Sequence, residues 1–241
     1  MIEKIEKFQI LILAVIFATA GLIAASMVTK SMSNNSISVT GSYSQNVTSD
    51  SGLLEMDIHA RKATKSAAFN ALNEQQPIII NYLKKQGFKE SEIELKSPNG
   101  YNVYVVTPNG MSTNKVEAYD ASQRISVKSN DVQKIKKIAT EISDLNSAVV
   151  DLNIYEPSYF YSKLSDLKVK MLEEAATDAK QRASAMLRPT HNKVGKIKSV
   201  KMGIFQVTPV DSNEVSDYGI NDVSSIEKKV TSVANVTFGI K

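Results

Sequence analysis

Cysteine and tryptophan are both missing from this chain of 241 residues. Without a thiol the protein has no disulfide, no cysteine nucleophile, no cysteine zinc site and no iron–sulfur cluster, because each of these needs a sulfur atom. The lack of disulfides does not identify the compartment, since a chain of this length can bury a core that needs no cross-links. Thiol chemistry is therefore excluded, and the location must be inferred from other features.

Motifs for catalysis or cofactor binding are also missing. The two histidines, His59 and His191, lie far apart and neither has a metal-type spacing such as H-x-x-x-H. The glycines stand singly, without a phosphate-binding loop, and no G-x-S-x-G sequence marks a nucleophilic serine. We expect no enzyme activity, no cofactor and no metal; a hydrolase with a dispersed Ser–His–Asp triad is the alternative.

The formal net charge is only +4, and both signs are spread along the chain. Proteins that bind nucleic acids cluster their basic residues, because affinity comes from contacts with many phosphates. We therefore expect no nucleic-acid partner.

The N-terminal segment from Phe8 to Val28 (FQILILAVIFATAGLIAASMV) has no charged residue. Its length matches the roughly 20 residues that cross a bilayer as a helix, and it lacks the polar stripe of a surface helix. Residues 1–32 are thus predicted to be a membrane anchor and linker, which would leave residues 33–241 to fold on the far side. The side chains expected in the lipid include Phe8, Ile10, Leu11, Leu13, Val15, Phe17, Leu22 and Ile23.

A cleaved signal peptide is the alternative to an anchor. Ala18-Thr19-Ala20 has the small-x-small pattern of a peptidase site. Against cleavage, the apolar run continues beyond Ala20, and the preceding MIEKIEK balances its lysines with glutamates. Both alternatives export the rest of the chain.

The folded part alternates paired strands with single helices. Thr64 and Asp131 are candidate N-caps, and Pro77 predicts a kink or break because proline lacks the amide that bonds to Asn73. Alternating patterns predict strands at Ser36–Ser49, Leu53–Ala60, Ile93–Thr107, Lys115–Lys128, Leu152–Tyr161, Ile197–Thr208 and Lys228–Ile240; three- and four-residue spacings predict helices at Thr64–Gly87, Asp131–Asp144 and Ser165–Leu187.

The order ββαββαβαββ favours an α+β fold of two antiparallel-sheet lobes with backing helices, at about residues 36–128 and 129–241. The first two strands are expected to form an antiparallel pair joined at Ser49–Gly52. Pro108-Asn109-Gly110 predicts the mobile tip of a hairpin, and Pro209–Ile226 predicts a long exposed loop. The loops Asn109–Lys115 and Asp211–Asp222 are candidate sites for capturing a partner.

Tyrosines gather near the predicted strand ends and are candidates for an interface. Ordinary packing within a β-sheet is the alternative. The five residues are Tyr101, Tyr104, Tyr155, Tyr159 and Tyr161.

Several short sequences, in this order and spacing, resemble the SIMPL-domain family of bacterial envelope and secreted proteins from about Ser36 to Ile240. They are Ile37-Ser38-Val39-Thr40-Gly41, Tyr82-Leu83-Lys84-Lys85-Gln86-Gly87-Phe88 followed by Glu92-Ile93, Tyr119-Asp120-Ala121, Ile125-Ser126-Val127, Ala175-Ala176-Thr177-Asp178-Ala179-Lys180 and Val194-Gly195-Lys196. The resemblance implies a periplasmic or surface-associated protein with two α+β lobes. Some members are linked to oxidative and envelope stress, some build ring-like oligomers, and a mammalian relative is an adaptor for a pelle-like kinase.

Two features depart from the family pattern. Pro77 interrupts a helix that is normally continuous in the family, and the acidic loop Asp211–Asp222 lies where the family has no fixed pattern, so a ring is not carried over. The family has no agreed catalytic residues. We expect a non-enzymatic periplasmic protein, anchored in the inner membrane, that self-assembles and acts in envelope or oxidative stress; an adaptor for an envelope partner or ligand is the alternative.

Overall fold

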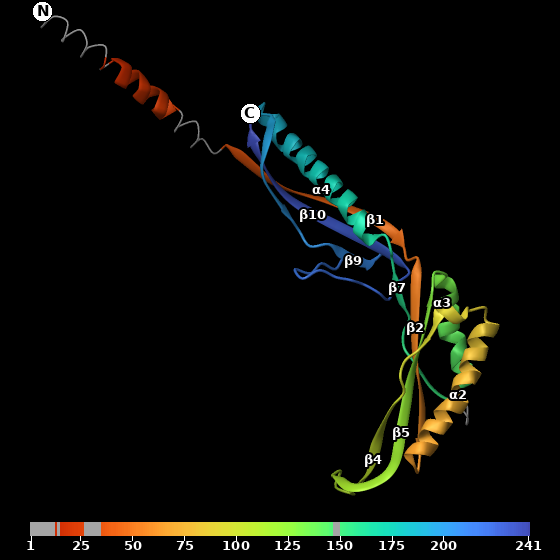
Figure 1. Cartoon of the computed structure of the whole chain (residues 1–241). Helices are drawn as coiled ribbons and strands as arrows, with labels where there is room; N and C mark the ends of the chain where they lie inside the picture. The colour runs from red at the N-terminus through yellow and green to blue at the C-terminus, as the bar shows by residue number, and fades with distance from the viewer. Residues whose placement is uncertain (1–12, 14, 27–34, 147–149) are drawn as a thin grey trace, which may run out of the picture. The chain divides into compact units, whose positions relative to one another are not determined.

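The computed structural model describes residues 13, 15–26, 35–146 and 150–241 (Figure 1). The described residues form two compact units. The first contains the chain up to Tyr43, Leu172–Gly203 and Val233–Lys241, and the second contains Ser44–Met171 and Ile204–Ser232. The expected α+β class is confirmed.

The second unit is built on an antiparallel sheet of six strands among the described residues. The two central strands, β2 (Ser51–Lys62) and β5 (Ser112–Ser129), pair along their length from Gly52 opposite Ser129 to Lys62 opposite Tyr119. The shorter strands are β3 (Ile93–Leu95) and β4 (Asn99–Val106), which pair with β5, and β6 (Asp151–Ile154) and β7 (Ser158–Phe160), which pair with β2.

Alternation along β2 gives this sheet one buried and one polar face, because successive side chains point to opposite sides. Leu54, Met56 and Ile58 are fully buried, while Glu55 and Asp57 lie between them on the other face. Two helices cover the buried face, α2 (Lys65–Lys85) and α3 (Val132–Glu141), and both contact β2 and β5. The predicted caps are confirmed, since the side chains of Thr64 and Asp131 accept hydrogen bonds from the amides of Ala67 and Lys134.

Of the kink or break predicted at Pro77, the break is wrong, because α2 continues through this residue to Lys85. Pro77 and Asn73, whose carbonyl loses its usual donor, both lie on the exposed side of the helix. Water can therefore bond to the freed carbonyl, while Leu72 and Ile79 remain fully packed on the buried side. The helix ends where predicted, since Gly87 takes the left-handed conformation with φ 85°.

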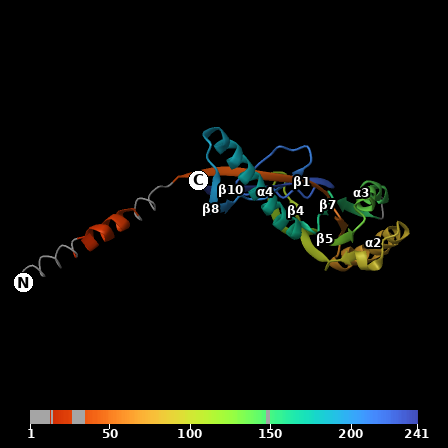
Figure 2. The same ribbon diagram turned by 90° about the horizontal axis from the view of Figure 1, so that it is seen from above.

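The first unit packs a helix against strands by means of small residues. Strand β10 (Glu227–Ile240) lies between β1 (Ser36–Thr48) and β8 (Val194–Met202). Helix α4 (Leu164–Leu187) covers this sheet with its residues from Leu172 onward (Figure 2). A Cβ atom on Gly41 would lie 2.1 Å from the carbonyl oxygen of Ala175, so only glycine allows this approach.

The pairing of β1 corrects the expected arrangement. Strands β1 and β2 follow each other in sequence but lie in different sheets, so they do not form the predicted pair. The predicted boundary between residues 128 and 129 falls inside the second unit, because strand pairing joins distant segments of the chain. Ser38 contacts Thr237 in the first unit and Ser44 contacts Thr231 in the second, each through its hydroxyl groups.

Three predicted strands are interrupted. The segment from Ile93 divides into β3 and β4 at Pro98, the segment from Leu152 divides into β6 and β7 at Pro157, and the segment from Ile197 divides into β8 and β9 (Gln206–Pro209). Proline cannot donate to a sheet ladder, which accounts for the first two interruptions. The loop predicted from Pro209 to Ile226 contains no regular element in the described chain, apart from an isolated bridge between Val207 and Asn221.

Residues 15–26 near the N-terminus are helical. Both ends of the predicted span, together with Phe8, Ile10 and Leu11, lie outside the described residues. Among the described residues, no helix combines the length and apolar character needed to cross a membrane. The remaining predicted lipid-facing side chains are all exposed by 56% to 71%: Leu13, Val15, Phe17, Leu22 and Ile23.

Candidate binding surfaces

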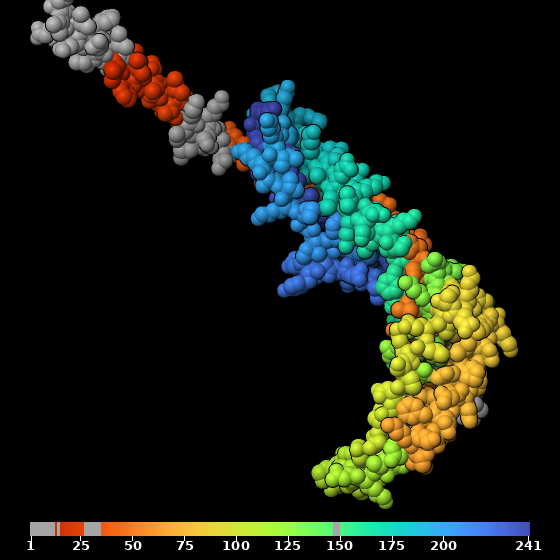
Figure 3. Space-filling view, viewed as in Figure 1, coloured from red at the N-terminus to blue at the C-terminus, as the bar shows by residue number. Residues whose placement is uncertain are grey.

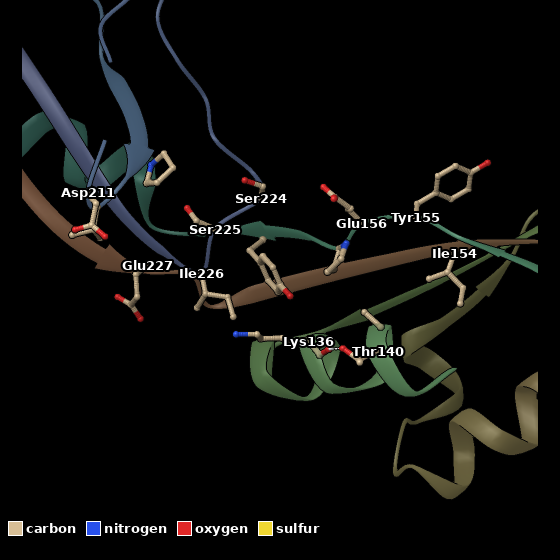
Figure 4. A pocket seen from close by; sticks show the side chains of 15 residues that line it. Lys136, Thr140, Ile154, Tyr155, Glu156, Asp211, Ser224, Ser225, Ile226 and Glu227 are labelled. Carbon is tan, nitrogen blue, oxygen red and sulfur yellow. Dashed lines mark hydrogen bonds between the residues drawn. The ribbon is translucent and has the colours of Figure 1, made fainter. Parts of the chain in front are cut away.

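An open hollow of about 840 Å³ lies in the second unit (Figure 4). Helix α3 supplies one wall, the connection between β6 and β7 supplies another, and the two ends of the loop that joins β9 to β10 supply the third. The chief lining residues are Lys136, Thr140, Ile154, Glu156, Pro157, Asp211, Ser224, Ser225, Ile226 and Glu227.

Acidic groups outnumber basic ones around this hollow. Glu156, Asp211 and Glu227 line it together with one cation, Lys136. The hydroxyl of Thr48 donates to Glu227 at 2.9 Å. Such a surface can bind a partner through van der Waals contacts and charge. Neither of the two histidines, one of which a Ser–His–Asp triad would need, is among the residues that line it.

A buried ion pair fixes the loop beside the hollow. Only 3% of the Lys228 side chain and 8% of the Asp222 side chain are exposed, and Lys228 Nζ lies 3.3 Å from Asp222 Oδ2. The same ammonium donates to the backbone carbonyl of Asp222 at 2.8 Å. Ser224 donates to Asp222 through its amide and hydroxyl, and Ser225 donates through its hydroxyl. The two serines that line the hollow are thus held by the pair.

Burial alone would raise the pKa of Asp222, but the hydrogen bonds from Ser225 and Ser224 and the charge of Lys228 outweigh it and lower this pKa to about 2. Burial also lowers the pKa of Lys228, against the opposing influence of Asp222. Sequence reasoning missed this pair. The available signal was that Lys228 occupies an inward position in the alternating β10 strand, followed by the buried Val230 and Ser232.

The polar face of the second unit's sheet carries cross-strand ion pairs. Arg124 Nε on β5 lies 2.8 Å from Asp57 Oδ1 on β2, and the Tyr155 hydroxyl donates to Asp57 Oδ2 at 2.8 Å. The hydrogen bond from Arg124 is the main cause that holds the pKa of Asp57 below its ordinary value, although burial opposes it. Arg61 pairs similarly with Asp120 at 3.2 Å. Both oxygens of Asp57 are bonded, which favours a structural role for this carboxylate, whereas the buried Oδ1 of Asp120 has no hydrogen-bond partner among the described residues.

The hairpin of β4 and β5 forms an arm, defined here as residues 99–119. Its base lies beside α2, where Gly100 and Tyr119 line a small pocket with Phe69, and its tip extends beyond the helices (Figures 1 and 3). The predicted turn at its tip is confirmed, with Gly110 at φ 79° and Thr107 bonded to Met111, while the mobility of the tip stays a prediction. Within the described residues, β4 pairs only with β5, so its other side is a free edge. Four large apolar side chains are 40% to 65% exposed there: Tyr101, Tyr104, Val106 and Met111.

The structure separates the five candidate interface tyrosines. Tyr101 and Tyr104 are exposed on the arm, whereas Tyr155 and Tyr159 line the hollow. Tyr159 is only 4% exposed and belongs to the main core, and its burial raises the pKa of its hydroxyl. Tyr161 lines a smaller cavity. The interface stays a prediction for the exposed residues.

The two candidate partner loops lie in different places. Asn109–Lys115 is the tip of the arm, and Asp211–Asp222 begins at the hollow and exposes Val215 and Tyr218 by 79% and 96%. The two histidines lie in different units. His59 Nδ1 lies 3.9 Å from Asp120 Oδ1, while His191 ends the short helix η3 (Arg188–Thr190) in the first unit. No cluster of three or more metal-ligating side chains occurs in the described part of the chain.

A family model described as SIMPL, protein of unknown function (DUF541), matches residues 37–238. This match covers both units. A comparison with curated proteins finds no match.

Proposed function

The chain belongs to the SIMPL family of proteins of unknown function, and we propose that this member is a non-enzymatic protein that assembles with copies of itself through the arm. The observation that carries the proposal is the free edge of β4 with its exposed apolar side chains. A free edge presents unpaired amide and carbonyl groups to any strand that can align with it.

The composition of the arm supports this use. Soluble proteins usually protect an exposed edge with lysine, inward-pointing charge, a bulge or a covering element. The ladder of β4 with β5 does have irregular register on either side of Tyr104, but β4 itself carries no protecting charge. Residues 97–114 contain no charged residue at all. Val106 is 59% exposed and Tyr104 is 40% exposed, so water contacts apolar surface along this edge. Antiparallel pairing of two β4 edges is self-complementary, as a twofold interface requires.

Membrane attachment and an envelope location complete the proposal. The uncharged run from Phe8 to Val28 supports an N-terminal anchor, with cleavage after Ala20 as the alternative. The resemblance to envelope proteins supports a periplasmic location and a part in envelope or oxidative stress. Alkaline extraction of membranes separates these alternatives, because an anchored chain stays in the pellet and a cleaved chain is released. A deletion strain that grows like its parent under peroxide would remove the stress role.

Self-assembly is tested by light scattering on the full-length chain in detergent micelles. We expect the wild-type chain to form oligomers at micromolar concentration, and Tyr104→Lys combined with Val106→Lys to give monomers, because two lysines oppose edge pairing. The matched control places the same charges elsewhere, at Val215→Lys and Tyr218→Lys, and should leave the oligomer intact. A wild-type chain that is monomeric at micromolar concentration contradicts the proposal.

A second candidate function is that of an adaptor which binds a different envelope protein in the hollow. The observation in its favour is the size of the hollow, about 840 Å³, with its acidic margin. A photo-crosslinking residue at Val210, which lines the hollow, should capture such a partner in cells. The same residue at Val215 is the control, since this position is exposed but does not line the hollow. Cross-links at Val210 to copies of this chain alone would favour self-assembly instead.

A further inference from the structure

A smaller cavity of about 180 Å³ lies in the second unit, apart from the arm. Its walls are mostly apolar. Its lining residues with polar groups are Asn221, Asp222, Lys228 and the two tyrosines Tyr159 and Tyr161. Engineered apolar cavities of about 150 Å³ hold a molecule such as benzene. The space is therefore suited to one ring with a small substituent. The apolar walls include Val47, Phe160, Leu164, Val207, Val223 and Val230.

Lys228 gives this cavity a specific chemistry. An ammonium group has three N–H donors. Among the described residues, Nζ has two hydrogen-bond acceptors, and both belong to Asp222, namely its backbone carbonyl and Oδ2. The third N–H is thus left for an acceptor in the cavity that Lys228 lines. A buried donor without an acceptor costs free energy, so an acceptor placed there contributes to binding.

The charge of the site restricts the ligand further. Asp222 and Lys228 cancel each other, and both side chains are at least nine-tenths buried. An anionic ligand would add an uncompensated charge in a buried place, which is unfavourable. A neutral acceptor avoids this cost. Lys228 also stays bonded to Asp222, which favours a role as a hydrogen-bond donor over one as a nucleophile.

We propose that this cavity binds a small neutral molecule with a single-ring apolar body and one carbonyl oxygen, which accepts a hydrogen bond from Lys228 Nζ. The apolar walls hold the ring, and the ammonium determines its orientation. This site is independent of the self-assembly proposed for the arm, so either proposal can fail alone.

Calorimetry with the full-length chain in lipid nanodiscs tests the site, after subtraction of the heat measured with empty nanodiscs. Acetophenone is the neutral carbonyl probe, ethylbenzene has a similar body without an acceptor, and benzoate carries a negative charge. We expect acetophenone to bind about tenfold more tightly than ethylbenzene, because hydrogen bonds to charged donors contribute about 1.5 kcal/mol or more. We expect benzoate to bind more weakly than acetophenone.

Two variants link this preference to the cavity. Lys228→Met combined with Asp222→Asn removes both charges together and should abolish the preference for acetophenone over ethylbenzene. Lys229→Met is the matched control on the neighbouring lysine and should retain it. If the double variant does not fold, Val223→Phe fills the cavity from the loop side and should prevent binding of both neutral probes.

Equal binding of acetophenone and ethylbenzene would overturn the proposal, as would tighter binding of benzoate. Absence of binding by every probe would mean that the cavity holds water alone, which also overturns it. Acetophenone binding that survives Val223→Phe would place the ligand elsewhere.

Discussion

The two units of this protein bury cores of opposite kinds. The second unit is filled by large aliphatic side chains, among them Leu54, Ile58 and Leu72, none of which is more than 1% exposed. In the first unit, small residues let the backbones of helix and strand approach closely, as Gly41 does against Ala175. Large side chains fill the core of the second unit, whereas in the first unit the helix and strand backbones lie so close that only small side chains fit between them.

This difference predicts opposite sensitivities to mutation. A filled core is weakened when atoms are removed, because the space left behind is only partly closed by relaxation. A closely approached core is weakened when atoms are added, because the added group forces backbones apart. If the two units unfold in separate transitions, a substitution that removes atoms should lower the transition temperature of the second unit. A substitution that adds atoms should lower that of the first unit.

The largest effect is expected for Leu54→Ala in the second unit. Leu54 lies on the central strand β2, opposite Val127 of β5, and is fully buried on the face that the helices cover. Leucine-to-alanine changes at such sites cost about 3–5 kcal/mol, through lost apolar burial and the cavity that remains. Differential scanning calorimetry should show the corresponding transition at lower temperature. A loss below about 1 kcal/mol would mean that this core is not tightly filled.

The next effect is expected for Gly41→Ala in the first unit. The added Cβ would meet the carbonyl oxygen of Ala175 at 2.1 Å and the amide nitrogen of Ala179 at 2.4 Å, so the helix must move. Overpacking of this kind typically costs about 1–3 kcal/mol. The measurement is again calorimetric, and the transition that Leu54→Ala lowers should stay in place.

Gly239→Ala is the matched control for this substitution. It adds the same methyl group within the first unit, but its nearest neighbours would lie at 3.6 Å, an ordinary contact distance. We expect a change of less than about 0.5 kcal/mol, the usual range where packing is undisturbed. Equal losses at Gly41 and Gly239 would contradict the close-approach account of the first core.

Many of the helices and strands could be predicted from the sequence, whereas the pairing of distant strands could not. Thr64, Gly87 and Asp131 mark helix ends through interactions with neighbours in the chain, so the signal is local. The pairing of β1 with β10 joins the two ends of the folded part, and no local pattern specifies it. Pro77 is a further example of a feature that the sequence alone does not settle. The free energy that this proline costs the helix depends on whether water reaches the carbonyl that it leaves unbonded.

The candidate sites were harder to predict than the fold. The hollow combines side chains of α3, the β6–β7 connection and the loop before β10, which meet only after folding. The arm was visible as two patterned strands around Pro108-Asn109-Gly110, yet its free edge depends on which strands lie beside β4. The Asp222–Lys228 pair was detectable in part, since a charged residue at an inward strand position demands a partner.

A comparable effect, confined to acid, is expected from Asp222 in the second unit. Its pKa is about 2 in the folded chain, below its ordinary value of 3.8. The unfolded chain therefore binds the proton more readily, and this contribution to stability, present above about pH 4, is lost as the pH falls toward 2. Its size is on the order of 2 kcal/mol. Urea unfolding from pH 5 to pH 2 should show a steeper loss for the wild-type chain than for Asp222→Asn. Parallel curves would mean that the ion pair contributes nothing that depends on pH in this range.

The smallest effect, and the sharpest test of whether the units are separable, is expected for Thr64→Ala. The Thr64 side chain accepts a hydrogen bond from the amide of Ala67 at 3.2 Å and so caps α2, which covers only the second unit's core. Loss of such a cap costs about 1 kcal/mol. The control is Ser66→Ala. Ser66 is exposed in the first turn of α2, so this change removes a hydroxyl without removing the cap. Thr64→Ala should lower the transition that responds to Leu54→Ala and leave the one that responds to Gly41→Ala unchanged. If it lowers both by the same amount, the two cores unfold as one cooperative block, and their contrast in packing has no counterpart in separate stabilities.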